Sequence, residues 1–302
     1  MLIGCPGFND MATTAESLID KTRELVSLPN IYLRLRAIVN DVRSSNRDVS
    51  VLISEDASLT ARILRIANSS FYGFPSKIDT ITRAVTVIGT RQIIDVVMAT
   101  TVLDVFDGVP KDKINMQSFW RHSIACGVAA RVFSTYRREV NVERFFVTGL
   151  LHDIGQLIMI LGMGDEYWQV IKHAEDNDLL LNLVEKEELG FDHAEVGALL
   201  LTKWELPKHM IDAVHNHHQP VNNGSLVIDA VVVHVAEVVS SAIHAAEGHR
   251  NTVAPLSGEG WDALGLPVSI LTPAVAQIQR QYVDALDLII PGKGEDDYAC
   301  AQ

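Results

Sequence analysis

The sequence is poor in cysteine, in positive charge and in long hydrophobic runs, and each of these deficits excludes a class of protein. Its three cysteines, Cys5, Cys126 and Cys300, are far apart and odd in number, which argues against a disulfide framework and for a reducing compartment. Acidic residues outnumber basic ones by 38 to 25, and the net charge of −13 repels phosphate backbones and anionic lipid headgroups. We therefore expect no direct binding of nucleic acid.

The apolar segments do not have the pattern of membrane spans either. No basic region followed by an apolar core opens the chain, so we expect no signal peptide, and no segment reaches the roughly 18 consecutive apolar residues of a span. The nearest one, residues 226–246, is interrupted by Asp229, His234, Glu237 and His244. It predicts a buried helix, and we expect a cytoplasmic protein that does not associate with membranes.

What the chain does have is helical periodicity, punctuated by glycine and proline, along most of its 302 residues, 48% of which are apolar. No run alternates as a strand would, so the pattern predicts an all-α fold. The segment DGVPKDKIN at 107–115 breaks the pattern and suggests a division into residues 1–110 and 111–302. The predicted helices cover residues 15–27, about 30–39, 49–54, 58–70, 82–88, 90–105, 116–136, 142–161, 164–176, 179–188, 192–204, 207–218, 225–246 and 269–286, with 248–265 as a loop.

Several histidines and carboxylates share helix faces that are otherwise apolar. LLHDIGQLI sets two of them side by side, and in PKHMIDAVHNHHQP at least one of three closely spaced histidines must turn inward. A single inward histidine is more often a core residue bonded to a backbone carbonyl, and a single glutamate can pair with lysine or lie at a wet helix edge. The inward-leaning set comprises His122, His152, Asp153, His193, Glu237 and one or more of His215, His217 and His218.

Taken together, these residues favour a metal centre. Consecutive helices of a bundle can each supply one or two ligands to a shared interior point. Imidazole with carboxylate suits iron, manganese, nickel or zinc. The adjacent His152 and Asp153 could serve two metal ions if the carboxylate bridges them, and such a pair is the usual machinery of phosphate ester hydrolysis. We expect one or two transition-metal ions.

The order of these residues resembles a known signature. His122, His152-Asp153 and a later acid at Glu237 resemble the H…HD…D pattern of the HD superfamily of metal-dependent phosphohydrolases. His193 and the pair His217-His218 resemble the additional ligands of its HD-GYP branch, whose members hydrolyse cyclic di-GMP at a two- or three-metal centre. The resemblance implies a metal site built from His122, His152, Asp153, His193, His217, His218 and Glu237, with Asp153 as the catalytic residue if the centre is active.

Longer motifs point to a different branch of the superfamily. SLPNIYLRL, SEDASLTARILRIANSSFYG and IDTITRAVTVIGTRQIIDVVMATTV resemble the first half of the HDOD domain. FWRHSIACGVAARV, LLHDIGQLI and HHQP resemble its second half, so that the similarity covers about residues 22–246. It implies an all-helical multi-helix bundle with an HD-like C-terminal half, acting as a regulatory module of bacterial signalling that is usually catalytically silent.

The sequence departs from both groups of relatives. It keeps nearly the whole ligand set, which many HDOD proteins are thought to have lost. Glu237 stands in place of the final aspartate, and QPVNNGSLVIDAV after His218 contains no GYP element. Cys126, one turn beyond His122, could approach the metal, although the ordinary role of a free cysteine is that of a small buried hydrophobe.

We therefore expect a bacterial HDOD-type signalling protein that binds other signalling proteins through its N-terminal half and retains a structural or regulatory metal site. One alternative is an active metal-dependent phosphohydrolase acting on a nucleotide or another phosphate-containing small molecule. A second is a metal-free scaffold for protein interactions. An enzyme should present basic residues around an open site, and no arginine or lysine lies within one turn of His152 or Glu237, which favours regulation.

Overall fold

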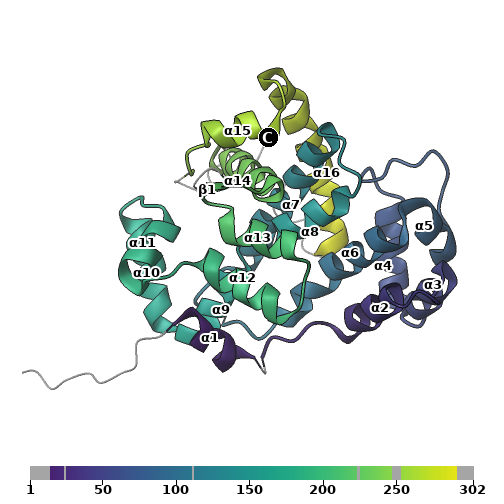
Figure 1. The fold of residues 1–302 in the computed structure, drawn as a ribbon, viewed down its shortest axis with the longest axis horizontal. Helices are drawn as coiled ribbons and strands as arrows, with labels where there is room; N and C mark the ends of the chain where they lie inside the picture. Colours follow the sequence, from purple (N-terminus) through teal and green to yellow (C-terminus); the bar gives the residue numbers. More distant parts are fainter. Residues whose placement is uncertain (1–13, 24, 111, 223–224, 247–252, 291–302) are drawn as a thin grey trace, which may run out of the picture.

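The computed structural model describes residues 14–290 except 24, 111, 223–224 and 247–252, and within these ranges most of the chain is helical (Figure 1). Besides loops and turns, the described chain contains one antiparallel pair of two-residue strands, β1 (Val221–Asn222) and β2 (Ser225–Leu226). The all-α prediction is confirmed. The α-helices are α1 (Ala15–Thr22), α2 (Asn30–Asn40), α3 (Asn46–Ser54), α4 (Ala57–Ala67), α5 (Ile81–Ile88), α6 (Thr90–Thr101), α7 (Met116–Tyr136), α8 (Val142–Leu151), α9 (Ile154–Met163), α10 (Asp165–Asp176), α11 (Leu181–Leu189), α12 (His193–Lys203), α13 (Lys208–Asn216), α14 (Ile228–Ala246), α15 (Gly258–Leu264) and α16 (Leu271–Ile289), with 3-10 turns η1 (Val102–Phe106) and η2 (Val268–Ile270).

Polar side chains fix where several helices begin and end. Asp56 and Asp192 precede α4 and α12, and each accepts a hydrogen bond from a backbone N–H of the first turn. Asn68 ends α4: its side-chain amide donates to the carbonyls of Leu64 and Ile78, both at 2.7 Å. Except for the one to Ile78, these bonds satisfy backbone groups that a helix end leaves open.

The largest differences from the predicted helices lie in two places. The predicted helix over 142–161 is interrupted at His152 and Asp153, which form a turn between α8 and α9. Apolar spacing continues across this point, so the pattern could not reveal the break. The predicted loop over 248–265 contains the short helix α15, and residues 247–252 lie outside the described part of the chain.

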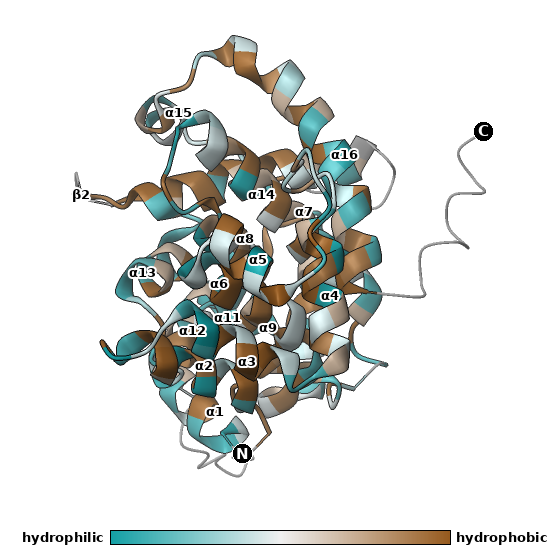
Figure 2. Cartoon of the chain, turned by 90° about the vertical axis from the view of Figure 1, so that its right-hand side faces the viewer, coloured by the Kyte–Doolittle hydropathy of each residue, from teal (hydrophilic) through white to brown (hydrophobic). Residues whose placement is uncertain are grey.

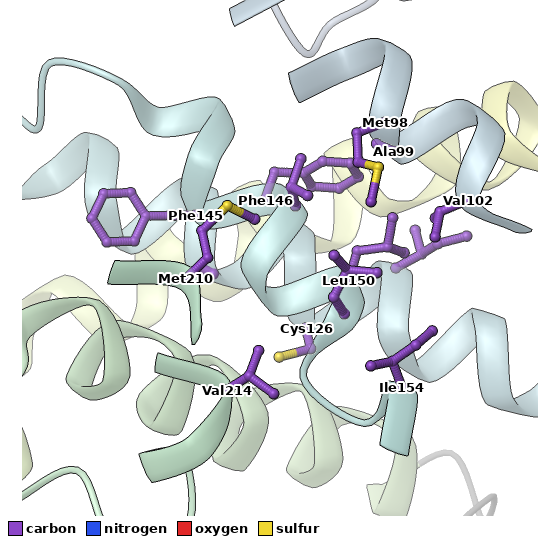
Figure 3. Close-up of a cluster of buried hydrophobic side chains, with 14 of the residues drawn as sticks. Met98, Ala99, Val102, Cys126, Phe145, Phe146, Leu150, Ile154, Met210 and Val214 are labelled. Atoms are coloured by element: carbon purple, nitrogen blue, oxygen red, sulfur yellow. The ribbon is translucent and has the colours of Figure 1, made fainter. Parts of the chain in front are cut away.

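One hydrophobic core runs through the molecule, with α7 at its centre, packed by α8, α14 and α16. Figure 2 shows the hydrophobic colour concentrated on interior helices such as α14. Figure 3 shows a part of this core in which Met98 of α6 and Val102 of η1 lie with Phe146 and Leu150 of α8. The core thus crosses the position near residue 110 where the sequence suggests a division. That division stays a prediction.

Among the described residues, two helical stretches are long and apolar enough to cross a membrane, Val142–Met163 and Ile228–Ala245. A third candidate meets this criterion only if Ile81–Ile88 and Thr90–Phe106, bent by 113°, count as one span. In the first two, 89% and 67% of the most apolar window is buried inside the protein. The burial of α14 confirms the prediction of a buried helix over 226–246.

Two helix crossings depend on glycine and bring the His152-Asp153 turn close to its neighbours. Where α7 meets α8, a Cβ on Gly149 would lie 2.8 Å from the Cα of Gly127. Where α9 meets α12, a Cβ on Gly155 would collide with the backbone carbonyl of His193 and lie 2.7 Å from the nitrogen of Gly197. Backbone atoms cannot move aside as a flexible side chain can, so both crossings require glycine.

We predict that Gly155→Ala lowers the free energy of unfolding by about 1–3 kcal/mol, the usual cost of overpacking a core. Chemical denaturation followed by circular dichroism measures the effect. Gly258→Ala, where an added Cβ meets nothing within 4 Å, is the matched control and should be nearly neutral. Equal stability of the two variants would show that α9 and α12 can separate without cost.

Candidate metal centre

His122 reaches the interior from the middle of α7. Its Nε2 lies 2.7 Å from Oε2 of Glu237 on α14 and 3.8 Å from Oδ2 of Asp153. The side chains of His122 and Glu237 both retain 12% of their exposure. The Glu237 carboxylate, in the apolar helix α14, therefore faces an imidazole.

His152 occupies the turn after α8, and its hydrogen bond defines which nitrogen faces the site. Nδ1 lies 2.7 Å from the carbonyl oxygen of Gly149. Because a carbonyl only accepts hydrogen bonds, Nδ1 must carry a proton. In the neutral ring, Nε2 then has a free lone pair, and it lies 3.0 Å from Oε2 of Glu237 and 3.4 Å from Oδ2 of Asp153.

The two oxygens of the Asp153 carboxylate face different histidines. Oδ2 is directed to His122 and His152, at 3.8 and 3.4 Å from their Nε2 atoms. Oδ1 lies 3.1 Å from Nε2 of His193 and 3.7 Å from Nε2 of His217. One carboxylate thus stands between two groups of imidazoles, as a carboxylate bridging two metal ions would.

The second group of imidazoles comes from the start of α12 and the end of α13. Donor atoms of His193, His217 and His218 all lie within 4.8 Å of one another. Nδ1 of His217 donates to the carbonyl of Val214 at 2.7 Å, and its buried Nε2 has no hydrogen-bond partner among the described residues. Nε2 of His218 lies 2.9 Å from Nε2 of His193. All the predicted ligand residues are therefore brought to one interior region, and His215 is not part of it.

Charge is distributed in this region in a way that suits a cation. Burial alone would raise the pKa of Asp153, but His152 and His193 hold it well below its usual range. Burial would likewise raise the pKa of Glu237, but the neighbouring His122 holds it well below its usual range. Both carboxylates are ionised at neutral pH.

The histidines differ in protonation. Burial and the neighbouring His152 lower the pKa of His217 to about 3, and burial and His217 lower that of His218 well below its usual range. Burial would lower the pKa values of His152 and His193. The carboxylates around the two rings outweigh this effect and raise both values, in His193 to about 10. Without metal, protons on these two rings neutralise the acids; with metal, all four rings can offer lone pairs.

Sequence reasoning missed Glu185 of α11, which is fully buried behind His193. Its Oε2 lies 2.6 Å from Nδ1 of His193 and accepts the backbone N–H of the same residue at 2.9 Å. Its Oε1 accepts the hydroxyl proton of Tyr167. Metal-binding histidines commonly have such a carboxylate on the remote nitrogen. In LNLVEKEEL the residue looks like part of a charged, solvent-facing helix, and no local signal separates it from its neighbours.

His234 has a different role from the other histidines of this region. Its Nδ1 donates to the carbonyl of His217 at 2.9 Å, and its Nε2 accepts the backbone N–H of Ser257 at 3.1 Å. Both nitrogens are used to hold backbone, so this ring supports the end of α13.

The donor atoms of the candidate site suit a transition-metal ion. They are imidazole nitrogens and carboxylate oxygens, and Nε2 of His217, which has no hydrogen-bond partner in the described part of the chain, is left for a cation to bind. The rings of His152, His217 and His193 are each fixed at the remote nitrogen by a carbonyl or a carboxylate. The residues could hold an ion on either side of Asp153.

Known proteins share the sequence pattern. The family model of the HDOD domain matches residues 25–220. An uncharacterized protein from Treponema pallidum (strain Nichols) is 27% identical over 209 residues, which are 68% of this chain and 39% of that protein. The chain thus spans well under half the length of this curated relative.

Solved structures share the fold. An HDOD domain protein of unknown function from Geobacter sulfurreducens has a TM-score of 0.70 at 21% identity, covering 91% of this chain and 98% of that one. A candidate phosphohydrolase from Shewanella amazonensis SB2B has a TM-score of 0.69 at 25% identity, covering 90% and 97%. A candidate signal transduction protein from Marinobacter aquaeolei VT8 has a TM-score of 0.68 at 18% identity, covering 90% and 60%.

We predict that Glu185→Gln lowers the pKa of the His193 ring in metal-free protein, because the Glu185 carboxylate beside Nδ1 is the strongest group that raises it. Titration of the ring signals by nuclear magnetic resonance measures the change. Glu188→Gln on the same helix is the control, since Glu188 pairs with the exposed His173. An unchanged titration of His193 in Glu185→Gln would remove Glu185 from the electrostatics of the site.

Proposed function

The chain belongs to the HDOD family, and from this premise we propose that it is a signalling regulator whose HD-like half holds one or two transition-metal ions. The observation that carries the proposal is the Asp153 carboxylate, which offers one oxygen to His122 and His152 and the other to His193 and His217. Iron, manganese, nickel and zinc all accept this mixture of imidazole and carboxylate. The ligands we propose are His122, His152, Asp153, His193, His217, His218 and Glu237.

Burial supports regulation over catalysis. His152 and His217 are 0% exposed, and Asp153 is 5% exposed. A catalytic metal keeps a coordination position open to substrate, whereas a structural one is closed by protein ligands. We propose that the ions hold the surrounding helices in one arrangement, and that signalling proteins contact the N-terminal helices α2 to α5, which carry none of the ligands.

A phosphohydrolase is the second candidate, and the same carboxylate favours it. Metal ions on both sides of Asp153 would act as Lewis acids toward a phosphoryl group. The Shewanella structure described above bears the name of such an enzyme, although only as a candidate. In this case the substrate would be a nucleotide or another phosphate ester, and Asp153 would be the residue on which activity depends.

We predict that untagged protein purified without chelator contains one or two equivalents of iron, manganese, nickel or zinc, and that Asp153→Ala loses most of it. The variant removes both oxygens shared by the two imidazole groups. Inductively coupled plasma mass spectrometry gives the metal content, and thermal denaturation checks that the variant folds. Asp165→Ala is the control, because Asp165 pairs with Lys113 on the surface. Absence of metal even after anaerobic reconstitution would contradict the proposal and leave a proton-sharing network.

We further predict that the metal-loaded protein does not hydrolyse bis-p-nitrophenyl phosphate or cyclic di-GMP. The ligand residues are largely buried, which limits the access of a phosphate ester, and no basic residue lies within one turn of His152 or Glu237 to bind it. Product release is followed by absorbance and by chromatography. Turnover that requires metal and disappears in Asp153→Ala would replace the regulatory function with the enzymatic one.

A further inference from the structure

Cys126 lies at the border between the apolar core and the candidate metal centre. It is fully buried on α7, one turn beyond His122, and no other cysteine lies among the described residues. Figure 3 shows its sulfur directed toward Val214 of α13, at the edge of a hydrophobic cluster. Within the described chain the thiol therefore has no disulfide partner, and its neighbours decide its role.

The sulfur also faces polar groups of the site. Sγ of Cys126, a ring nitrogen of His152 and a carboxylate oxygen of Glu237 all lie within 4.8 Å of one another. Because Nδ1 of His152 donates to the Gly149 carbonyl, the nitrogen that can face Cys126 and Glu237 is Nε2. That atom is buried, on a residue with 0% exposure; it lies 3.0 Å from Oε2 of Glu237, and no described residue completes a hydrogen bond to it. A buried nitrogen is thus aimed at the thiol and the carboxylate.

The two sides of Asp153 consequently differ in donor chemistry. The group of His193, His217 and His218 offers nitrogen, completed by a carboxylate oxygen. The group of His122 and His152 has in addition a sulfur within reach. Thiolate is a soft ligand that favours zinc and iron over harder ions such as manganese.

We propose that Cys126 is a thiolate ligand of the metal ion held by His152 and Glu237. The inference rests on the proposed metal centre and goes beyond it, because it makes the two metal positions chemically unequal. When the sulfur–metal bond forms, the thiol proton is released to solvent and the sulfur carries the negative charge into the bond. The position beside Cys126 then selects a softer ion than the position beside His218.

Cobalt(II) is the probe, because a cobalt–thiolate bond gives a near-ultraviolet charge-transfer band, while cobalt bound only by nitrogen and oxygen gives visible bands alone. The host is the Cys5→Ser, Cys300→Ser protein, in which Cys126 is the single remaining cysteine. In this background we compare the host with Cys126→Ser and Cys126→Ala. His218→Ala is the matched control, since it removes a ligand of the other group.

The expected result is a charge-transfer band in the host that is lost in both Cys126 variants and retained in His218→Ala. Visible cobalt bands in the Cys126 variants then report that the remaining ligands still bind. Visible bands without any charge-transfer band in the host would overturn the role of Cys126 and leave the metal centre intact. Failure of the host to bind cobalt, with its folding verified by circular dichroism, would overturn the metal centre and this inference together.

Discussion

The need to neutralise one buried carboxylate organises the centre of the protein. Asp153 is 5% exposed and ionised, and an unpaired charge in such a place would be too costly for a stable fold. Imidazoles approach both of its oxygens, and they come from α7, from the turn after α8, from α12 and from the turn after α13. These helices must therefore converge on a single point, and the fold around them follows from that convergence.

The helices can approach one another this closely because glycines stand where α7 crosses α8 and where α9 crosses α12. Gly127 and Gly149 let α7 and α8 touch backbone to backbone, and Gly155 and Gly197 do the same for α9 and α12. His152 and Asp153 lie at the break between α8 and α9, and His152 Nε2 lies 3.4 Å from Oδ2 of Asp153.

The helix that supplies His122 also contacts the N-terminal half. Further along α7, Arg131 lies over the ring of Phe71 at 4.1 Å and near that of Tyr72 at 5.3 Å, both from the segment ANSSFYG. Its guanidinium is 3.5 Å from Glu143. A change at His122 and a change at this segment would both act on α7. This helix therefore connects the candidate site with the N-terminal half, as a regulatory role requires.

The sequence by itself determined the helical class, most helix positions and the inward direction of the candidate ligands, because helical periodicity is a property of neighbouring residues. Only the tertiary structure decided where the helix over 142–161 breaks, that Glu185 stands behind His193, and that the two oxygens of Asp153 face different histidines. These depend on pairs of residues far apart in the chain, such as Asp153 with His193 and Glu237 with His122. No local pattern records such pairs, since the distance between two helices is set by what packs between them.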